Sequence, residues 1–263
     1  GVMGAALATS IACAVGGAMV FAYFFRFADK LRFYPLKRTL TSLLLTLRNT
    51  GYMVRIGFAT FLTELAMSVM MLTGNHMFIS MLGEEGVAAF AIACYLFPVV
   101  FSISNAVAQS AQPIISFNYG AHLLHRVSRT LRISVLTAVI CGVSVTVGLW
   151  AGSAQVVSMF LSPQESAYGL AVEGVPLFAL CAVFFAINIA FIGYYQSIEK
   201  AMVSTVYTLL RGILFLVPCF VLLPRVFGVP GLWLAIPAAE LLTCAVIYIR
   251  YVRQKKEFDI EIS

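Results

Sequence analysis

A single carboxylate stands in the middle of an apolar stretch between Thr60 and Asn75, TFLTELAMSVMMLTGN. Helical spacing places Thr60, Glu64, Ser68, Met71 and Asn75 on one face of a helix. An isolated carboxylate in a bilayer costs at least ~2.5 kcal/mol, so this one is expected to face a bundle interior or a wet cavity. There it can take up a proton or attract a cation, which makes Glu64 the first candidate for a functional residue. Ser68 and Asn75, on the same face, are candidates for lining the cavity that it faces.

Amide side chains form a second polar stripe further along the chain. Asn105, Gln109 and Gln112 follow three- and four-residue spacing, and Pro113 is expected to interrupt their helix after Gln112. These amides are candidates for lining a cavity, although hydrogen bonding between helices, at ~0.6 kcal/mol per bond, explains them equally well. Asn188, in the middle of a later apolar stretch, raises the same two possibilities of substrate or cation contact and of packing.

Two further charges of opposite sign, Arg211 and Glu240, lie deep inside apolar stretches. At 1.5 Å per residue, each lies roughly 12 to 14 Å from the nearer end of its helix. Matched depth predicts an ion pair, because each group would otherwise be an unpaired charge in a low-dielectric bundle. The pair is either purely structural or opens and closes as the protein works.

The composition identifies an integral membrane protein. Hydrophobic residues make up 61% of the 263 residues and charged residues 11%, against roughly 25% charged in soluble domains. The net charge is +6, but Lys and Arg form no stripe with interleaved aromatic residues, so no nucleic-acid partner is expected. Histidines and cysteines show no ligand spacing and no CxxC pair, so no metal site or organic cofactor is expected.

Seven apolar stretches are each long enough for the ~20 residues that a bilayer requires. They lack the period-two alternation of a membrane β-barrel, so the predicted fold is an all-α bundle of seven transmembrane helices. The predicted spans are residues 3–25, 56–81, 86–115, 130–152, 170–195, 203–223 and 231–251.

Basic residues set the predicted orientation in the membrane. Most Lys and Arg residues lie in or beside the segment 26–55, the loop 116–129 and the C-terminal tail, whereas the opposite connections carry Glu84 and Glu165. By the positive-inside rule, these two basic loops and the tail are expected in the cytoplasm.

An internal repeat predicts the domain organisation. The pattern GVxGxxLA at residues 1–8 recurs at residues 228–235, so the first and last helices look like counterparts in two parallel repeats, unless the match is a chance one between two small-residue helices. The last six helices then form one complete lobe, and the first helix ends a preceding lobe. The predicted domains are the last helix of an N-terminal lobe (1–25), a cytoplasmic linker (26–55), a six-helix C-terminal lobe (56–252) and a cytoplasmic tail (253–263).

Three stretches resemble the multidrug and toxic compound extrusion (MATE) family: AQSAQPIISFNYGA at 108–121, GVPGLWLAIPAAE at 228–240 and the opening GVMGAALAT. The resemblance implies a twelve-helix, two-lobe transporter of the cell inner membrane, whose N-terminal lobe is the partner of the lobe seen here. It implies alternating access, with H+ or Na+ moving inward in exchange for a small organic cation. By resemblance, Glu64 matches the cation-coupling carboxylate of the seventh helix, and Asn188 stands where some members carry an aspartate on the tenth.

Three other functions agree less well with the sequence. A flippase of a lipid-linked precursor has the same architecture but needs a cavity rich in Arg and Lys, whereas Arg211 is the one basic residue deep inside a span here. A seven-helix receptor fits the number of spans, yet the last two spans carry no Lys for a Schiff base and the outer connections carry no cysteine pair. An intramembrane enzyme lacks its motifs, since HExxH, GxSxG and a paired aspartate are all missing.

Overall fold

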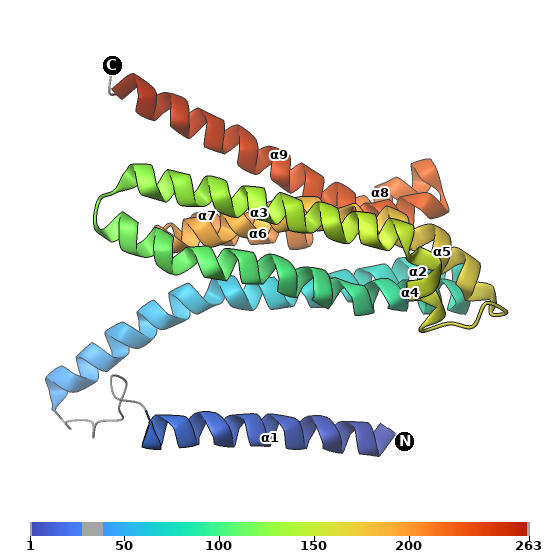
Figure 1. Ribbon diagram of the computed structural model, residues 1–263, viewed down its shortest axis with the longest axis horizontal. Coiled ribbons are helices and arrows are strands. Elements are labelled where there is room, and N and C mark those ends of the chain that lie inside the picture. The colour runs from blue at the N-terminus through green and yellow to red at the C-terminus, as the bar shows by residue number, and fades with distance from the viewer. Residues whose placement is uncertain (1, 28–38, 262–263) are drawn as a thin grey trace. The chain divides into compact units, whose positions relative to one another are not determined.

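The computed structural model describes residues 2–27 and 39–261, and every regular element in these two ranges is a helix (Figure 1). The chain divides into two compact units, Gly1–Tyr52 and Met53–Ser263. The smaller unit holds α1 (Val2–Arg26), which carries no charged residue before Arg26, and the beginning of α2 (Leu40–Gly120). Every functional residue predicted from the sequence belongs to the larger unit.

The helix α2 is bent at one glycine. Gly83 has a φ of 67° and a ψ of −153°, a conformation that glycine adopts readily because it lacks a Cβ. The bend falls between the predicted spans 56–81 and 86–115, so the expected boundary is present as a kink. A second glycine with positive φ, Gly228 at 62°, separates the last two helices.

In the described part of the chain, six helices are long and apolar enough to cross a membrane. One of them, Glu64–Gly120, runs for 57 residues across the kink at Gly83. The all-helical membrane architecture is therefore confirmed, whereas the number of seven spans stays a prediction.

After α2 the chain turns back, so that α3 runs opposite to the second half of α2 (Figure 1). The remaining elements are α3 (Leu124–Ala151), α4 (Ser153–Ser158), α5 (Ser166–Ala179), α6 (Cys181–Ser197), α7 (Ala201–Leu209), the π-helical turn η1 (Leu210–Leu214), α8 (Leu216–Phe227) and α9 (Val229–Glu261).

Two predicted spans are interrupted in the structure. The span 170–195 divides at Leu180 into α5 and α6, shortly after Pro176, which lacks the N–H that a continuous helix needs. The span 203–223 contains η1 between α7 and α8, and the short α4 lies in a connection for which the sequence predicts no helix.

The expected interruption at Pro113 is wrong, because α2 continues through this residue to Gly120. A proline removes one backbone hydrogen bond, and neighbouring helices in a membrane bundle can satisfy the group that it frees. At its other end, α2 begins at Leu40, inside the segment 26–55 that the sequence predicts to be a linker. Residues 28–38 of that segment lie outside the described residues.

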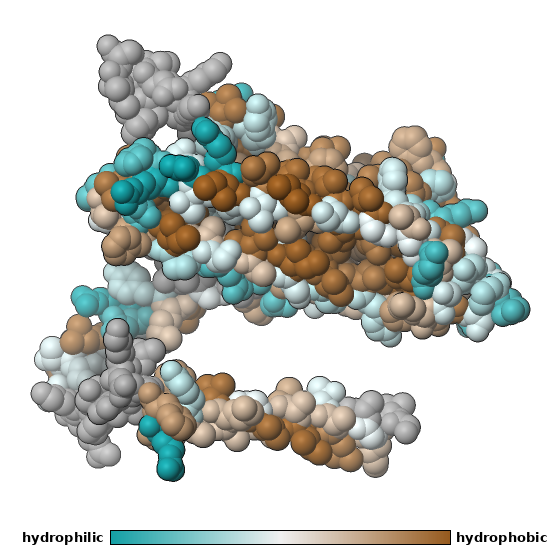
Figure 2. Space-filling model, in the orientation of Figure 1, coloured by the Kyte–Doolittle hydropathy of each residue, from teal (hydrophilic) through white to brown (hydrophobic). Residues whose placement is uncertain are grey.

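The larger unit is built around α6, which packs against α3, α7 and α9. Small residues allow this close approach: a Cβ on Gly142 of α3 would lie 2.7 Å from the backbone of Val183 on α6. Figure 2 shows apolar side chains along the middle of the α3 face and hydrophilic ones gathered towards the ends of this unit. The exposed apolar side chains of α3 include Leu136, Ile140, Val143 and Val147, as expected of a lipid-facing surface.

Candidate functional site

A polar cavity of about 300 Å³ lies between α2 and α6 in the larger unit. Its polar lining consists of Glu64, Asn105, Gln109 and Gln112 from α2, and Gln196 from α6. Glu64 comes from the part of α2 before the kink at Gly83, and the other three α2 residues come from the part after it. The structure thus brings together the carboxylate and the amide stripe, which the sequence places on two different predicted spans.

Helical geometry and one hydrogen bond hold the amide groups in place. Asn105, Gln109 and Gln112 lie on one face of α2 because their spacing follows the helical repeat. The Gln112 Nε2 donates a hydrogen bond of 3.2 Å to Oε1 of Gln196. Through this bond the two helices that form the cavity are joined side chain to side chain.

A glycine allows α6 to approach α2 closely beside the cavity. A Cβ on Gly193 would lie 3.2 Å from the Ala108 Cβ and 3.3 Å from the Gln112 Nε2. The apolar remainder of the lining is Phe101, Ala108, Ile189, Ile192 and Gly193. At this position a larger side chain would occupy space that now belongs to the cavity.

The chemistry of this cavity follows from its charges. Glu64, which is exposed, is the one charged side chain among the described residues that line it, and four neutral amides accompany it. A carboxylate attracts a cation or takes up a proton, and amides both donate and accept hydrogen bonds. The cavity is therefore suited to a positively charged ligand with hydrogen-bonding groups.

Ser68 and Asn75, which share the predicted polar face with Glu64, do not line this cavity in the described structure. The Ser68 hydroxyl donates to the backbone carbonyl of Glu64 at 3.4 Å, and Asn75 is half-buried. Asn75 lies about 16 Å further along the helix than Glu64, at 1.5 Å per residue. Among the described side chains of this face, Glu64 is the one that reaches the cavity.

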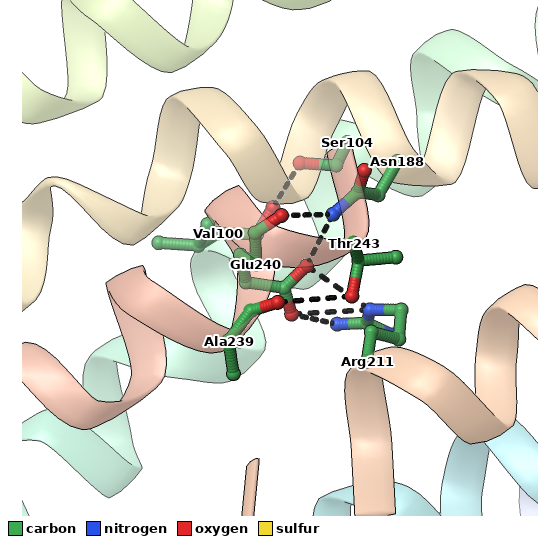
Figure 3. Close-up of polar contacts among 7 residues, drawn as sticks. All are labelled: Val100, Ser104, Asn188, Arg211, Ala239, Glu240 and Thr243. Atoms are coloured by element: carbon green, nitrogen blue, oxygen red, sulfur yellow. Dashed lines mark hydrogen bonds and ion pairs between the residues drawn. The ribbon is translucent and has the colours of Figure 1, made fainter. Parts of the chain in front are cut away.

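Arg211 and Glu240, expected to pair because of their matched depth, form a buried ion pair (Figure 3). The Arg211 Nη2 lies 2.7 Å from the Glu240 Oε1, and Nε donates to the same oxygen at 3.0 Å and to Oε2 at 3.2 Å. The two residues are 5% and 3% exposed. The Arg211 Cζ also lies 4.2 Å from the centre of the Phe185 ring, where a cation is attracted to the aromatic face.

Asn188 belongs to this ion pair rather than to the polar cavity. Its Nδ2 donates to the Glu240 Oε2 at 2.7 Å and to the Glu240 backbone carbonyl at 2.9 Å (Figure 3). The residue is fully buried, and its Oδ1 has no hydrogen-bond partner among the described residues. The structure thus places this predicted substrate or cation contact against the carboxylate of another helix.

The arginine of the ion pair comes from an irregular turn. Arg211 lies in the π-helical turn η1, and such turns are frequent at functional sites. A small cavity of about 20 Å³ borders the pair and is otherwise apolar, with α2 contributing Ala66, Met67 and Met70. The helix that carries Glu64 therefore also touches the environment of Arg211.

Sequence reasoning missed Gln196 and the partner of Asn188. A polar side chain near the end of an apolar stretch is typical of a membrane interface, although three-residue spacing from Gly193 places Gln196 on the cavity face. No group of three or more His, Cys, Asp or Glu side chains that could hold a metal ion occurs within the described ranges.

Comparisons with known proteins agree with the fold. The sequence model of the MatE family matches residues 59–221. Multidrug export protein MepA of Staphylococcus haemolyticus is 25% identical over 252 residues, which cover 95% of this chain and 54% of the relative. This chain therefore spans about half the length of that relative.

Two solved structures share the fold at low sequence identity. The outward-facing conformation of a multidrug resistance MATE family transporter matches with a TM-score of 0.82 and 20% identity, over 97% of this chain and 57% of that one. A MOP superfamily transporter from Pyrococcus furiosus, whose binding pocket of reverse polarity suggests a different function, matches with a TM-score of 0.81 and 19% identity, over 96% and 56%.

Proposed function

The chain belongs to the MATE family of membrane transporters, and we propose that it forms one lobe, with one helix of the other, of a cation-coupled exporter of small organic cations. The observation that carries this proposal is the polar cavity with a single carboxylate, Glu64, among four amides. MepA, a multidrug export protein, aligns with nearly the whole chain. The N-terminal lobe is the proposed partner and completes the central pathway.

The proposed mechanism is competition at one carboxylate. Ionised Glu64 attracts an organic cation, while the amides of Gln109, Gln112 and Gln196 hydrogen-bond its polar groups. A proton or Na+ that enters from outside neutralises Glu64 and removes that attraction, so the organic cation leaves. Alternating access of the two lobes then couples inward movement of H+ or Na+ to outward movement of the organic cation.

The basic loops orient this cycle in the membrane. With the segment 26–55, the loop 116–129 and the tail in the cytoplasm, the organic cation leaves towards the outside of the inner membrane. His125, Arg126 and Arg129 near the start of α3 are exposed, as residues of a loop in water on either side of the membrane would be.

A flippase is less well supported than an exporter of cations. A cavity that holds a pyrophosphate needs several free cationic side chains, but Arg211 is bonded to Glu240 and borders the small, otherwise apolar cavity. The polar cavity itself carries Glu64, whose charge repels a phosphate. A cationic substrate fits these charges better.

Export of ethidium from efflux-deficient cells tests the proposal, using the complete two-lobe protein at matched membrane levels. We expect the intact protein to lower ethidium accumulation and Glu64→Gln to abolish this effect. Glu85→Gln is the matched control, because Glu85 lies on the same helix and is exposed outside the cavity. Normal export by Glu64→Gln, or no export of several cations by the intact protein, would contradict the proposal.

A further inference from the structure

The buried ion pair is connected to both walls of the polar cavity. Glu240 of α9 accepts hydrogen bonds both from Arg211 of η1 and from Asn188 of α6. Of the three elements that these bonds join, α6 forms one wall of the cavity and η1 packs against α2, which forms the other. A change in these polar contacts would therefore reach both walls of the cavity.

The first connection runs from Arg211 to the helix of Glu64. Gly212, directly after Arg211, faces Ala66 so closely that a Cβ at position 212 would overlap the Ala66 side chain. Ala66 follows Glu64 by two residues on α2. The position of η1 therefore fixes how closely the Glu64 turn of α2 approaches the bundle.

The second connection runs from Glu240 to the α6 wall. Asn188 is held by two hydrogen bonds to Glu240, and the next residue, Ile189, lines the polar cavity. The Asn188 amide cannot rotate by 180° without facing its oxygen towards the Glu240 oxygens, which would exchange attraction for repulsion. Its orientation, and with it that of this turn of α6, is set by Glu240.

Stability alone does not account for this arrangement. Apolar residues of similar volume often replace a buried ion pair without loss of stability, because they avoid the desolvation of two charges. The hydrogen bonds that the Arg211 guanidinium and the Asn188 amide donate to Glu240 instead fix how these side chains are oriented, which apolar contacts do not. The Asn188 Oδ1 is buried and has no hydrogen-bond partner among the described residues.

We propose that Arg211, Glu240 and Asn188 are positioning residues. They set the distance between α6 and the turn of α2 that carries Glu64, and this distance sets the affinity of the polar cavity for its cation. None of the three lines that cavity. This inference rests on the proposed function, since it concerns the same cavity.

The test compares an apolar double variant with the intact two-lobe protein. In Arg211→Met/Glu240→Met the charges are removed together, so we expect membrane levels and melting temperature to stay unchanged. We expect the apparent KM for ethidium export to rise by about tenfold while the maximal rate changes little, because small misplacements of a binding group are costly. Thr146→Val, which removes a buried hydrogen bond from α3 to the Ala179 carbonyl, is the control and should keep the intact KM.

A folded double variant with the KM of the intact protein would overturn the inference. If the double variant yields no folded protein, Arg211→Lys tests the inference instead, because lysine keeps the charge but loses the two-pronged hydrogen bonding of the guanidinium. A raised KM in folded Arg211→Lys supports the inference, and an unchanged KM overturns it. An intact protein that exports no cation instead overturns the proposed function, and this inference with it.

Discussion

Glu64 of α2 and Gln196 of α6 line one polar cavity although most of the larger unit separates them in the sequence. Gln196 is tied to Gln112 by a hydrogen bond, so two of the amide groups that accompany the carboxylate are held by each other. A cavity in which one charge is accompanied by neutral, fixed amides provides both attraction for a cation and a means to orient it.

The amide pair is expected to contribute to affinity. Replacing Gln196 by Leu removes the acceptor of the Gln112 Nε2 and one of the polar groups that line the cavity. We expect the apparent KM for ethidium export to rise by about three- to tenfold, in line with the loss of a hydrogen bond to a charged or polar ligand. Gln155→Leu, an exposed position on α4, should leave the KM unchanged.

Cavity volume at Gly193 is expected to limit the substrate. A leucine at this position would fill space between α6 and the Ala108 and Gln112 side chains, so Gly193→Leu should abolish export while the protein still reaches the membrane. A Cβ on Gly148 of α3 would meet no atom within 4 Å, so Gly148→Leu is the matched substitution and should export normally. Equal activity of both variants would show that the cavity does not carry the cation.

Single substitutions in the ion pair should be far more harmful than the double one. Arg211→Met leaves Glu240 as a buried, unpaired charge, and we expect the free energy of unfolding to fall by about 3–5 kcal/mol. Adding Glu240→Met should restore it, because both charges are then removed together. Thermal unfolding of the purified variants in detergent measures both effects, and a single variant as stable as the intact protein would contradict the expectation.

The contact between η1 and α2 should tolerate no added volume. Gly212→Ala places a methyl group where the Ala66 side chain lies, so the helices must separate at a cost of roughly 1–3 kcal/mol. Gly148→Ala adds the same methyl group in open space and should be neutral or slightly stabilising. The difference between the two melting temperatures checks the prediction.

Sequence patterns identified the polar residues of the site better than they identified the residues that each of them contacts. Helical spacing identified the face of Asn105, Gln109 and Gln112, and matched depth identified the pairing of Arg211 with Glu240. Both patterns are visible in the sequence because a polar group in an apolar membrane helix is costly unless it faces a cavity or a polar partner. The cation-coupling role of Glu64 stays a prediction.

Which residue a polar side chain contacts depends on how its helix is rotated against its neighbours, and local sequence does not determine this rotation. The π-helical turn at Arg211 occurs in an apolar stretch whose hydropathy is the same for a π turn and an α turn, so no pattern reveals it. Asn188 lies against Glu240 because α6 and α9 pack together, which depends on the tertiary fit of small residues. Depth along a helix can be counted from the sequence, but which neighbour a side chain faces cannot.

The most direct test of the account is the pH dependence of ethidium binding to the purified two-lobe protein, measured by fluorescence with Glu64 intact and with Glu64→Gln. Glu64 is the one titratable side chain among the described residues that line the cavity. We predict that the intact protein binds ethidium more weakly as the solution is acidified, because protons compete with the cation for Glu64. Glu64→Gln should bind weakly at every pH. The same loss of affinity on acidification in both proteins would contradict the central claim that the exported cation binds at Glu64 in competition with the coupling ion.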